Sequence, residues 1–436
     1  DRAEEIRNRI GDMAASARNV AVRGTALYQG RQRESSQELA RTALERFKDL
    51  GPEDPAMIDL ALLQARSAIS TGEYDVALAT AERLVIVAER LGLARIVAET
   101  LVIKGVVYFY RGRLWEARAV LEGARIVAQS FSLPEVELRA IHNLGLGIGL
   151  DDPRAAVDLE RLGLALARRL GERATEVVLL GNASEDSRRT GDWSWAMAEL
   201  ASAIQLDIDA ASRRAMAVVH AAFLAYQGAL SNQALEALTQ DVQGIEDTDI
   251  AAGTFDVTAA LAAATGDWRG AYEAYIATAD NSVLNAPYAL PPAGIFAIVA
   301  GDAPLARGVL DRLQSIGTRG RAVDANRLAI EGGILALEGD PAGGLAAFRQ
   351  SVALLGDLGL SWDEVWVVMA AVARLGADDP EIASWVERAR ETLERVGALP
   401  VLTQLNQLVA EKPSGTTGGE QKRKGAAPVA GSEVAG

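Results

Sequence analysis

The stretch Arg111–Ala117 reads RGRLWEA, and the chain returns to its pattern at regular intervals. In each copy a Gly ends one predicted helix, a polar or acidic residue follows, and a small residue stands five positions after the Gly. Gly in this place suits the left-handed end of a helix, so the pattern predicts two helices joined by a tight turn. The other copies are Thr71–Ala77 (TGEYDVA), Thr190–Ala196 (TGDWSWA), Thr265–Ala271 (TGDWRGA) and, more loosely, Ala300–Ala306 (AGDAPLA) and Glu338–Gly344 (EGDPAGG).

The predicted turns recur with a nearly constant period of 35 to 40 residues. They lie at Gly72, Gly112, Asp152, Gly191, Gly228, Gly266, Gly301 and Gly339. A period of this size with a helix on each side of the turn indicates an α-solenoid, in which each hairpin buries its apolar stripe against its neighbours. We therefore predict an all-α, right-handed solenoid of about nine to ten helical hairpins.

The chain outside the clearest repeats divides by composition. Residues 1–55 are predicted to form N-terminal capping helices, 56–359 the repeat array and 360–411 closing helices. Residues 412–436 are rich in Gly, Ser, Thr, Pro and Ala without apolar periodicity, which predicts a disordered tail.

Three stretches carry more local predictions. Residues 1–29 are expected to form one helix. Gln240–Gly253, which is acidic and polar, and Asp280–Ala293 are expected to be irregular. The second of these contains Pro287, Pro291 and Pro292, and proline inside a helix removes a backbone hydrogen bond.

With its turns aligned, the chain resembles the tetratricopeptide repeat (TPR) family over residues 56–359. That family places a small residue seven positions before the turn Gly, and Gly105, Gly294 and Gly332 occupy this position here. The long period and the helix endings AERLG at Gly92 and ARRLG at Gly171 are similar to one subgroup. This subgroup is the C-terminal TPR region of bacterial signalling ATPases, either LuxR-type ATP-binding regulators or ATPase-fused nucleotide cyclases.

Composition argues against several kinds of partner. The formal net charge is −15, which disfavours direct binding of nucleic acid or of an anionic membrane surface. The chain has no cysteine, no apolar run near 18 residues and no signal peptide, so the default expectation is a cytoplasmic protein. The first residue is Asp1, which suggests a segment of a longer polypeptide with neighbouring domains.

No motif in the sequence predicts catalysis. The chain lacks a phosphate-binding loop, a hydrolase nucleophile elbow, an H-E-x-x-H helix and a calcium loop. Its two histidines, His142 and His220, have no metal-like partner three or four positions away. We therefore expect no cofactor, no metal site and no enzymatic activity.

The resemblance implies a binding groove lined by the first helix of each hairpin. Counting repeat positions back from the turns places ten residues there: Arg66, Phe109, Tyr110, His142, Asn143, Asn182, Glu185, Arg188, Arg189 and Tyr226. Arg188 and Arg189, with Asn143 and Asn182, are suited to hold a peptide carboxylate or a small anionic effector. The alternative is that both arginines are solvated charges near a helix C-terminus, and that His142 is a structural residue.

The same positions in the second half of the array are apolar or small. They are Ala260, Ala263, Ile295, Ile298, Gly333 and Ala336. Such a groove either packs against a partner helix or closes on itself, and we favour closure. Trp115, Trp193, Trp195 and Trp268 follow turns and are expected to pack between repeats, and Trp362 and Trp366 to seal the core or dock a neighbouring domain.

Three functions follow from these patterns. The first is a non-enzymatic interaction and sensor module, which the resemblance implies is the regulatory region of a larger bacterial signalling protein. A protein, peptide or small effector in the groove would shift how the array packs on its neighbouring domains. The second is a free-standing scaffold that assembles protein partners. The third is an enzyme whose site spans the two stretches expected to be irregular.

Overall fold

The computed structural model describes residues 2–9, 12–30, 32–205, 208–242, 248–282, 285–317 and 319–411. This part of the chain forms 22 α-helices, one short 3-10 helix at Lys48–Leu50 and no strand. The predicted fold class, an all-α helical-repeat solenoid, is confirmed. The predicted disordered tail, 412–436, lies outside the described residues.

The helices follow one another in antiparallel pairs. Three helices precede the repeats: α1 (Arg2–Arg9), α2 (Met13–Gln29) and α3 (Arg33–Arg46). The first four repeats are α4 (Pro55–Ser70) with α5 (Tyr74–Arg90), α6 (Ala94–Tyr110) with α7 (Leu114–Ser130), α8 (Pro134–Gly149) with α9 (Pro153–Leu170), and α10 (Arg173–Thr190) with α11 (Trp193–Ile204). The next four are α12 (Ala210–Tyr226) with α13 (Asn232–Val242), α14 (Thr248–Thr265) with α15 (Trp268–Asn281), α16 (Ala286–Ala300) with α17 (Ala303–Ser315), and α18 (Arg321–Leu337) with α19 (Pro341–Leu358). The closing helices are α20 (Ser361–Leu375), α21 (Pro380–Val396) and α22 (Leu399–Ala410).

All eight predicted turns lie between paired helices, and the residues of the pattern explain why. At Gly266 the backbone has a φ of 80°, in the left-handed region that Gly adopts without strain. The next residue, Asp267, caps α15 by accepting a hydrogen bond from the N–H of Gly270 at 2.9 Å. The small residue five positions after the Gly, here Ala271, is fully buried between the two helices.

Small residues let paired helices approach closely. In the α18–α19 hairpin a Cβ on Gly332 would lie 2.9 Å from the carbonyl oxygen of Gly344, and a Cβ on Gly344 would lie 2.8 Å from that of Gly332. Both distances are too short for a side chain, so the two backbones touch directly. This contact explains why Gly stands seven positions before the turn in this repeat.

Several local predictions were wrong. The span 1–29 contains two helices, α1 and α2. Within Gln240–Gly253, the residues before 243 belong to α13 and those from Thr248 to α14, and 243–247 lie outside the described residues. In Asp280–Ala293 the expected interruption exists, because α15 ends at Asn281 and α16 begins at Ala286, but the residues from Ala286 onward are helical rather than irregular; 283 and 284 lie outside the described residues.

The α16 helix shows why proline did not break the chain where expected. Pro287 lies in the first turn, where its missing N–H is not needed. Pro291 and Pro292 lie farther inside and each lacks a helical N–H. Leu290 and Phe296 on the same helix are fully buried, so tertiary packing outweighs the two missing hydrogen bonds.

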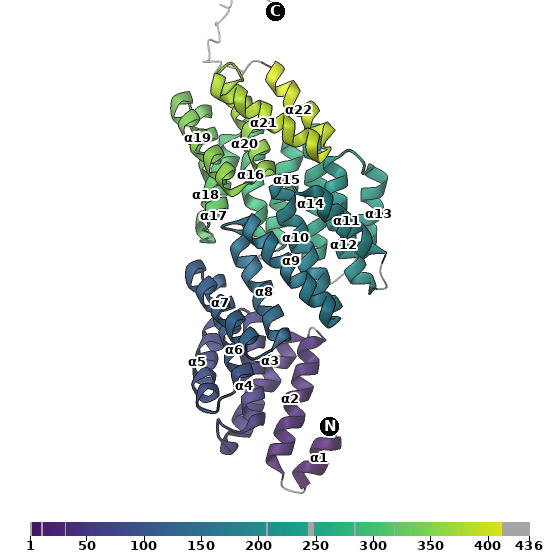
Figure 1. Ribbon diagram of the computed structural model, residues 1–436, viewed down its shortest axis with the longest axis vertical. Coiled ribbons are helices and arrows are strands. Elements are labelled where there is room, and N and C mark those ends of the chain that lie inside the picture. Colours follow the sequence, from purple (N-terminus) through teal and green to yellow (C-terminus); the bar gives the residue numbers. More distant parts are fainter. Residues whose placement is uncertain are drawn as a thin grey trace, which may run out of the picture.

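The second half of the array curves back so that distant segments meet. The molecule is elongated, with α1 at one end and the closing helices at the other, beside α14–α16 (Figure 1). Arg321, at the start of α18, pairs with Asp151 at 3.1 Å and Asp152 at 3.0 Å in the α8–α9 turn. Tyr288 on α16 donates a hydrogen bond from its hydroxyl to the carbonyl of Leu146 on α8 at 2.9 Å.

The α20 helix lies inside this curve and contacts α10, α16 and α18. Trp362 and Trp366 are 3% and 5% exposed, and the residues from Val367 to Val372 are buried on every side of the helix. A helix that is apolar all round is a core element. The rings of Trp193 and Trp362 lie 4.6 Å apart, and those of Phe296 and Trp366 lie 4.9 Å apart, so the tryptophans seal the core.

The closing helices also contact the turn glycines of four successive repeats. A Cβ built on Gly228 would lie 2.7 Å from Cγ of Pro400, and a Cβ built on Gly301 would lie 3.0 Å from Nη1 of Arg374. Gly191 faces Ser361 and Arg395 in the same way, and Gly266 faces Gln404. The turns therefore serve both to reverse the chain and to receive the closing helices.

Candidate interaction surfaces

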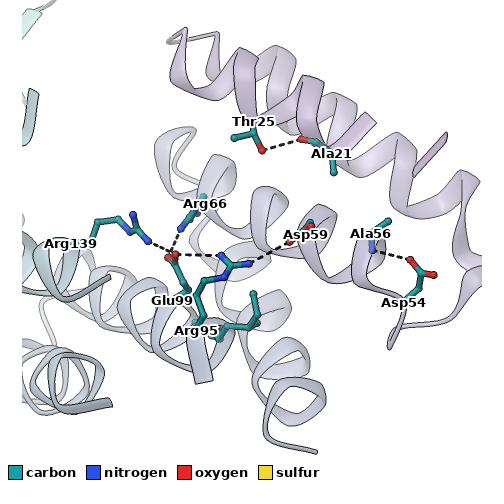
Figure 2. Close-up of polar contacts among 11 residues, drawn as sticks. Ala21, Thr25, Asp54, Ala56, Asp59, Arg66, Arg95, Glu99 and Arg139 are labelled. Carbon is teal, nitrogen blue, oxygen red and sulfur yellow. Dashed lines mark hydrogen bonds and ion pairs between the residues drawn. The ribbon is translucent and has the colours of Figure 1, made fainter. Parts of the chain in front are cut away.

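A group of charged residues converges on the face shared by α4, α6 and α8. Glu99 on α6 accepts hydrogen bonds from Arg66 on α4 and Arg139 on α8, and Arg95 lies 3.9 Å from the same carboxylate (Figure 2). Arg95 also lies 3.7 Å from Asp59 on α4. We call these five residues the Glu99 cluster: Asp59, Arg66, Arg95, Glu99 and Arg139.

The Glu99 cluster has an excess of positive charge that solvent can reach. The Glu99 side chain is 3% exposed, whereas those of Arg66, Arg95 and Arg139 are 27%, 51% and 40% exposed. Within the cluster three guanidinium groups face two carboxylates, and Glu135 supplies a further carboxylate near Arg139. Burial lowers the pKa of Arg139, with the attraction of Glu99 opposing the change and the repulsion of Arg66 adding to it.

Aromatic side chains gather at the C-terminal end of α6. The rings of Tyr74 and Tyr110 stack at 5.3 Å, and Phe109 meets Tyr110 edge-on at 5.5 Å. Phe109 also lies beside Gly147 of α8, where a Cβ would be 3.6 Å from its ring. The predicted groove residues Phe109 and Tyr110 are half-buried here, so part of each ring can still contact a partner.

Two further predicted residues lie on α8. Nδ1 of His142 is buried and has no hydrogen-bond partner in the described part of the chain. Burial lowers the pKa of His142 to about 4, so its ring is neutral near pH 7 and does not act as a charge switch there. Asn143 donates a hydrogen bond to the carbonyl of Arg139 at 2.8 Å, which holds its amide against its own helix.

The predicted pair Arg188 and Arg189 is engaged inside the protein. Arg188 binds Asp256 of α14 at 2.9 Å, and its side chain is 14% exposed. Arg189 binds Asp363 of α20 at 2.9 Å and donates to the carbonyl of Gly149 at 3.0 Å. These contacts differ from both sequence interpretations, because the two arginines join the first half of the array to its second half.

The residues near these arginines form a buried acidic junction. Asp186 on α10 is 6% exposed and lies 3.6 Å from Arg189. Burial, reinforced by Asp363, raises the pKa of Asp186 to about 7 against the opposing effect of Arg189. Glu160 on α9 is 1% exposed, and neither of its oxygens has a hydrogen-bond partner among the described residues.

The remaining predicted positions lie around this junction. Nδ2 of Asn182 is buried without a partner in the described chain, and Glu185 is exposed on the same helix. Tyr226 is 1% exposed, and its hydroxyl lies 3.0 Å from that of Tyr275. Of the ten predicted residues, Arg66, Phe109, Tyr110, His142 and Asn143 lie on α4, α6 and α8.

The second half of the array is closed, as favoured from its sequence. Ala260, Ala263, Ile295 and Ile298 are at most 1% exposed, and α20 packs against α16 and α18 where a partner helix would otherwise bind. One tryptophan prediction was wrong, because Trp115 is 72% exposed. Trp193 is 2% exposed, as expected for packing between repeats.

The described residues show neither a metal site nor a membrane helix. No group of three or more histidine or acidic side chains among them is placed to hold a metal ion. None of the described helices combines the length and apolar character needed to cross a membrane.

No protein-family model and no curated protein sequence matches the chain. Among solved structures, the apo form of the quorum sensor NprR from B. thuringiensis has a TM-score of 0.41 at 11% identity, over 93% of this chain and 99% of that chain. The APC/C hetero-tetramer Cut9–Hcn1 has a TM-score of 0.34 at 11% identity, over 92% and 97% of the two chains. Yeast Tom70 has a TM-score of 0.29 at 11% identity, over 90% and 96%.

The paired helices make the chain a helical-repeat protein in its architecture. Any binding site therefore has to be inferred from the contacts within this chain. The Glu99 cluster and the buried acidic junction are the two polar assemblies described so far. Sequence reasoning found only Arg66 in the Glu99 cluster. Asp59, Glu99 and Arg139 each stand thirteen positions before a predicted turn, at the second repeat position, so the same count contained the missing signal.

Proposed function

We propose that this chain is a protein-interaction module that binds an acidic peptide segment of a partner on the face of α4, α6 and α8. The excess of guanidinium groups in the Glu99 cluster supports the proposal most strongly. Three arginines from successive inner helices stand together in a chain whose net charge is −15. Guanidinium groups bind carboxylates through paired, charge-assisted hydrogen bonds.

The rest of the same face supports a peptide ligand. Phe109 and Tyr110 lie farther along α6 and offer partly exposed rings for an apolar side chain of the ligand. In the second half of the solenoid α20 occupies the corresponding place, so the first half is the part left for a partner. The Glu99 carboxylate keeps the three arginines aligned, and Arg95, the most exposed, is placed to meet the ligand first.

The proposal is tested by selecting binders from an array of random peptides with the purified protein. We expect the selected peptides to be enriched in Asp and Glu. A double variant, with Arg95 replaced by Ala and Arg139 by Gln, should bind the best peptide about tenfold or more weakly, a loss of ~1.4 kcal/mol in binding free energy. The matched control is Arg90→Ala on α5, which removes an exposed arginine paired with Glu53 and should leave binding unchanged.

Circular dichroism of each variant checks that the helices remain folded. Arg95→Ala alone provides a milder variant, since this side chain is half exposed and makes only the longer contacts to Glu99 and Asp59. Peptides without acidic enrichment, or equal affinity for wild type and both variants, would show that the face does not recognise acidic peptides.

We further propose that the module regulates a larger bacterial signalling protein. The resemblance of the repeats to those of signalling ATPases supports this context. Binding on the α4–α6–α8 face would act by favouring one packing of the array on its neighbouring domain. An ATPase or cyclase domain encoded in the same reading frame before Asp1 would support the idea. A start codon directly before Asp1 would contradict it.

A further inference from the structure

A cavity of about 620 Å³ lies where the closing helices meet the repeat array. Its walls are one face of α9, the turn between α10 and α11, and the C-terminal ends of α12 and α21. A second cavity of about 300 Å³ shares Arg154, Thr190 and Arg395 with it and extends to the turn before α20. Small-molecule sites commonly enclose roughly 300–1,000 Å³, so the larger cavity is wide enough for a small ligand.

Two of the arginines that line this cavity are already held by the protein. Arg161 pairs with Asp192, and its guanidinium lies 3.9 Å from the centre of the Trp195 ring. Arg395 donates to the carbonyl of Gly191 at 2.7 Å and to Oγ of Ser361 at 3.0 Å. Both acceptors of Arg395 are neutral, so these contacts fix the position of its guanidinium without neutralising its charge.

Arg154 has no hydrogen bond or ion pair with any described residue. Its side chain is exposed, and its guanidinium lies beside the turn before α20, where Nη1 would be 2.8 Å from a Cβ built on Gly359. It stands in the first turn of α9, where the helix macrodipole disfavours a cation. Asp192 is bound by Arg161, and Glu364, which lines the second cavity, is bound by Arg388. Asp158 is therefore the one carboxylate lining the two cavities that no described arginine binds.

We propose that this cavity binds a small organic anion whose phosphate or carboxylate group is held between Arg154 and Arg395. Guanidinium groups recognise both anions through two parallel hydrogen bonds. Val157, Met197 and Val396 supply an apolar wall for the body of the ligand. Because Arg154 belongs to the array and Arg395 to α21, the bound anion stabilises the docked state of the closing helices.

Isothermal titration calorimetry with phenyl phosphate and with benzoate tests the proposal on the full chain. At least one probe should bind saturably to the wild type, and the preferred probe identifies the anion as phosphate or carboxylate. Arg154→Ala should weaken this binding about tenfold or more. Arg169→Ala is the matched control, because Arg169 is exposed at the other end of α9, outside the cavity, and should leave the affinity unchanged.

A second readout follows the closing helices directly. Saturating probe should slow proteolytic removal of α21 and α22 from the wild type and from Arg169→Ala, and have no such effect on Arg154→Ala. Arg154→Gln keeps a polar side chain but removes the charge. It tests the same role of Arg154 if the alanine variant does not fold. The proposal is overturned if neither probe binds the wild type up to about 10 mM, or if both Arg154 variants retain wild-type affinity.

Discussion

Replacing Trp362 with Ala should lower the free energy of unfolding of the second half by about 3–5 kcal/mol, the usual cost of removing a large buried aromatic ring. Trp362 is 3% exposed, and its ring contacts rings on α11, α12 and α20. Its ring lies 4.6 Å from Trp193 of α11, 4.9 Å from Tyr226 of α12 and 5.2 Å from Trp366 of its own helix. The substitution therefore leaves a cavity at the point where α20 enters the curve of the array.

Urea denaturation followed by circular dichroism measures this effect. Repeat arrays can unfold in parts, so loss of the closing helices should appear as an early transition in the Trp362→Ala variant. The matched control is Trp115→Ala, since Trp115 is 72% exposed and its removal should change stability by less than ~0.5 kcal/mol. Equal losses for the two variants would contradict the structural role given to Trp362.

Replacing Glu160 with Gln should make the protein more resistant to rising pH. Burial raises the pKa of Glu160 well above its ordinary value, and the charges of Asp186 and Glu185 raise it further. Folding above the unfolded-state pKa must therefore take up a proton, which costs about 1.4 kcal/mol per pH unit for a single group. Protonated Glu160 makes its full contribution to stability below the pKa it has in the unfolded chain, and this contribution is lost as pH rises through the pKa it has in the folded protein.

The groups that face this carboxyl define the expected pH window. Asp186, whose pKa is raised to about 7, takes up a second proton on folding and acts in the same direction. The other charged or titratable groups of the junction are Arg188, Arg189 and Glu185 on α10, Tyr288 on α16 and Asp363 on α20. We expect wild-type stability to fall between pH 5 and pH 8, chiefly through these two carboxyls.

Denaturation at pH 5 and at pH 8 compares the wild type with Glu160→Gln. The variant should match the wild type within about 1 kcal/mol at pH 5 and exceed it at pH 8, because glutamine has no proton to take up. Glu331→Gln removes an exposed carboxylate on α18 and should keep the wild-type dependence on pH. A Glu160→Gln variant that lost stability with pH as steeply as the wild type would show that Glu160 does not bind the proton.

The sequence predicted the features that depend on a few neighbouring residues. Gly at a left-handed turn, Asp at the following cap and a small residue such as Ala271 each act within one hairpin, so their spacing was enough to place the repeats. Trp193 stands two positions after its turn Gly, whereas Trp115 stands three positions after its own, and Leu114 takes the second position there. The position within the repeat therefore already separates the two rings, and α12 and α20 pack over Trp193.

Contacts between distant parts of the chain decided the candidate sites. Arg189 meets Asp363, 174 positions away in sequence, only because the array curves back on itself. Repeat counting correctly placed Arg189 on an inner helix but gave no sign of its partner. In the Glu99 cluster the partners come from adjacent repeats, and there the same counting identifies the second-position residues Glu99 and Arg139.

The contacts between closing helices and turn glycines divide the molecule mechanically. A solenoid in which each repeat touches only its neighbours can extend and twist through small rotations between successive repeats. The closing helices span the turns at Gly191, Gly228, Gly266 and Gly301, so the pitch of these repeats cannot change without breaking several contacts together. No described residue lies within 4 Å of the place of a Cβ on Gly72, where the turn is free of such a brace. At the next turn a Cβ built on Gly112 would lie 3.4 Å from the carbonyl oxygen of Gly317. A load along the chain would therefore deform α4 and α5 first, and α4 carries Asp59 and Arg66 of the Glu99 cluster.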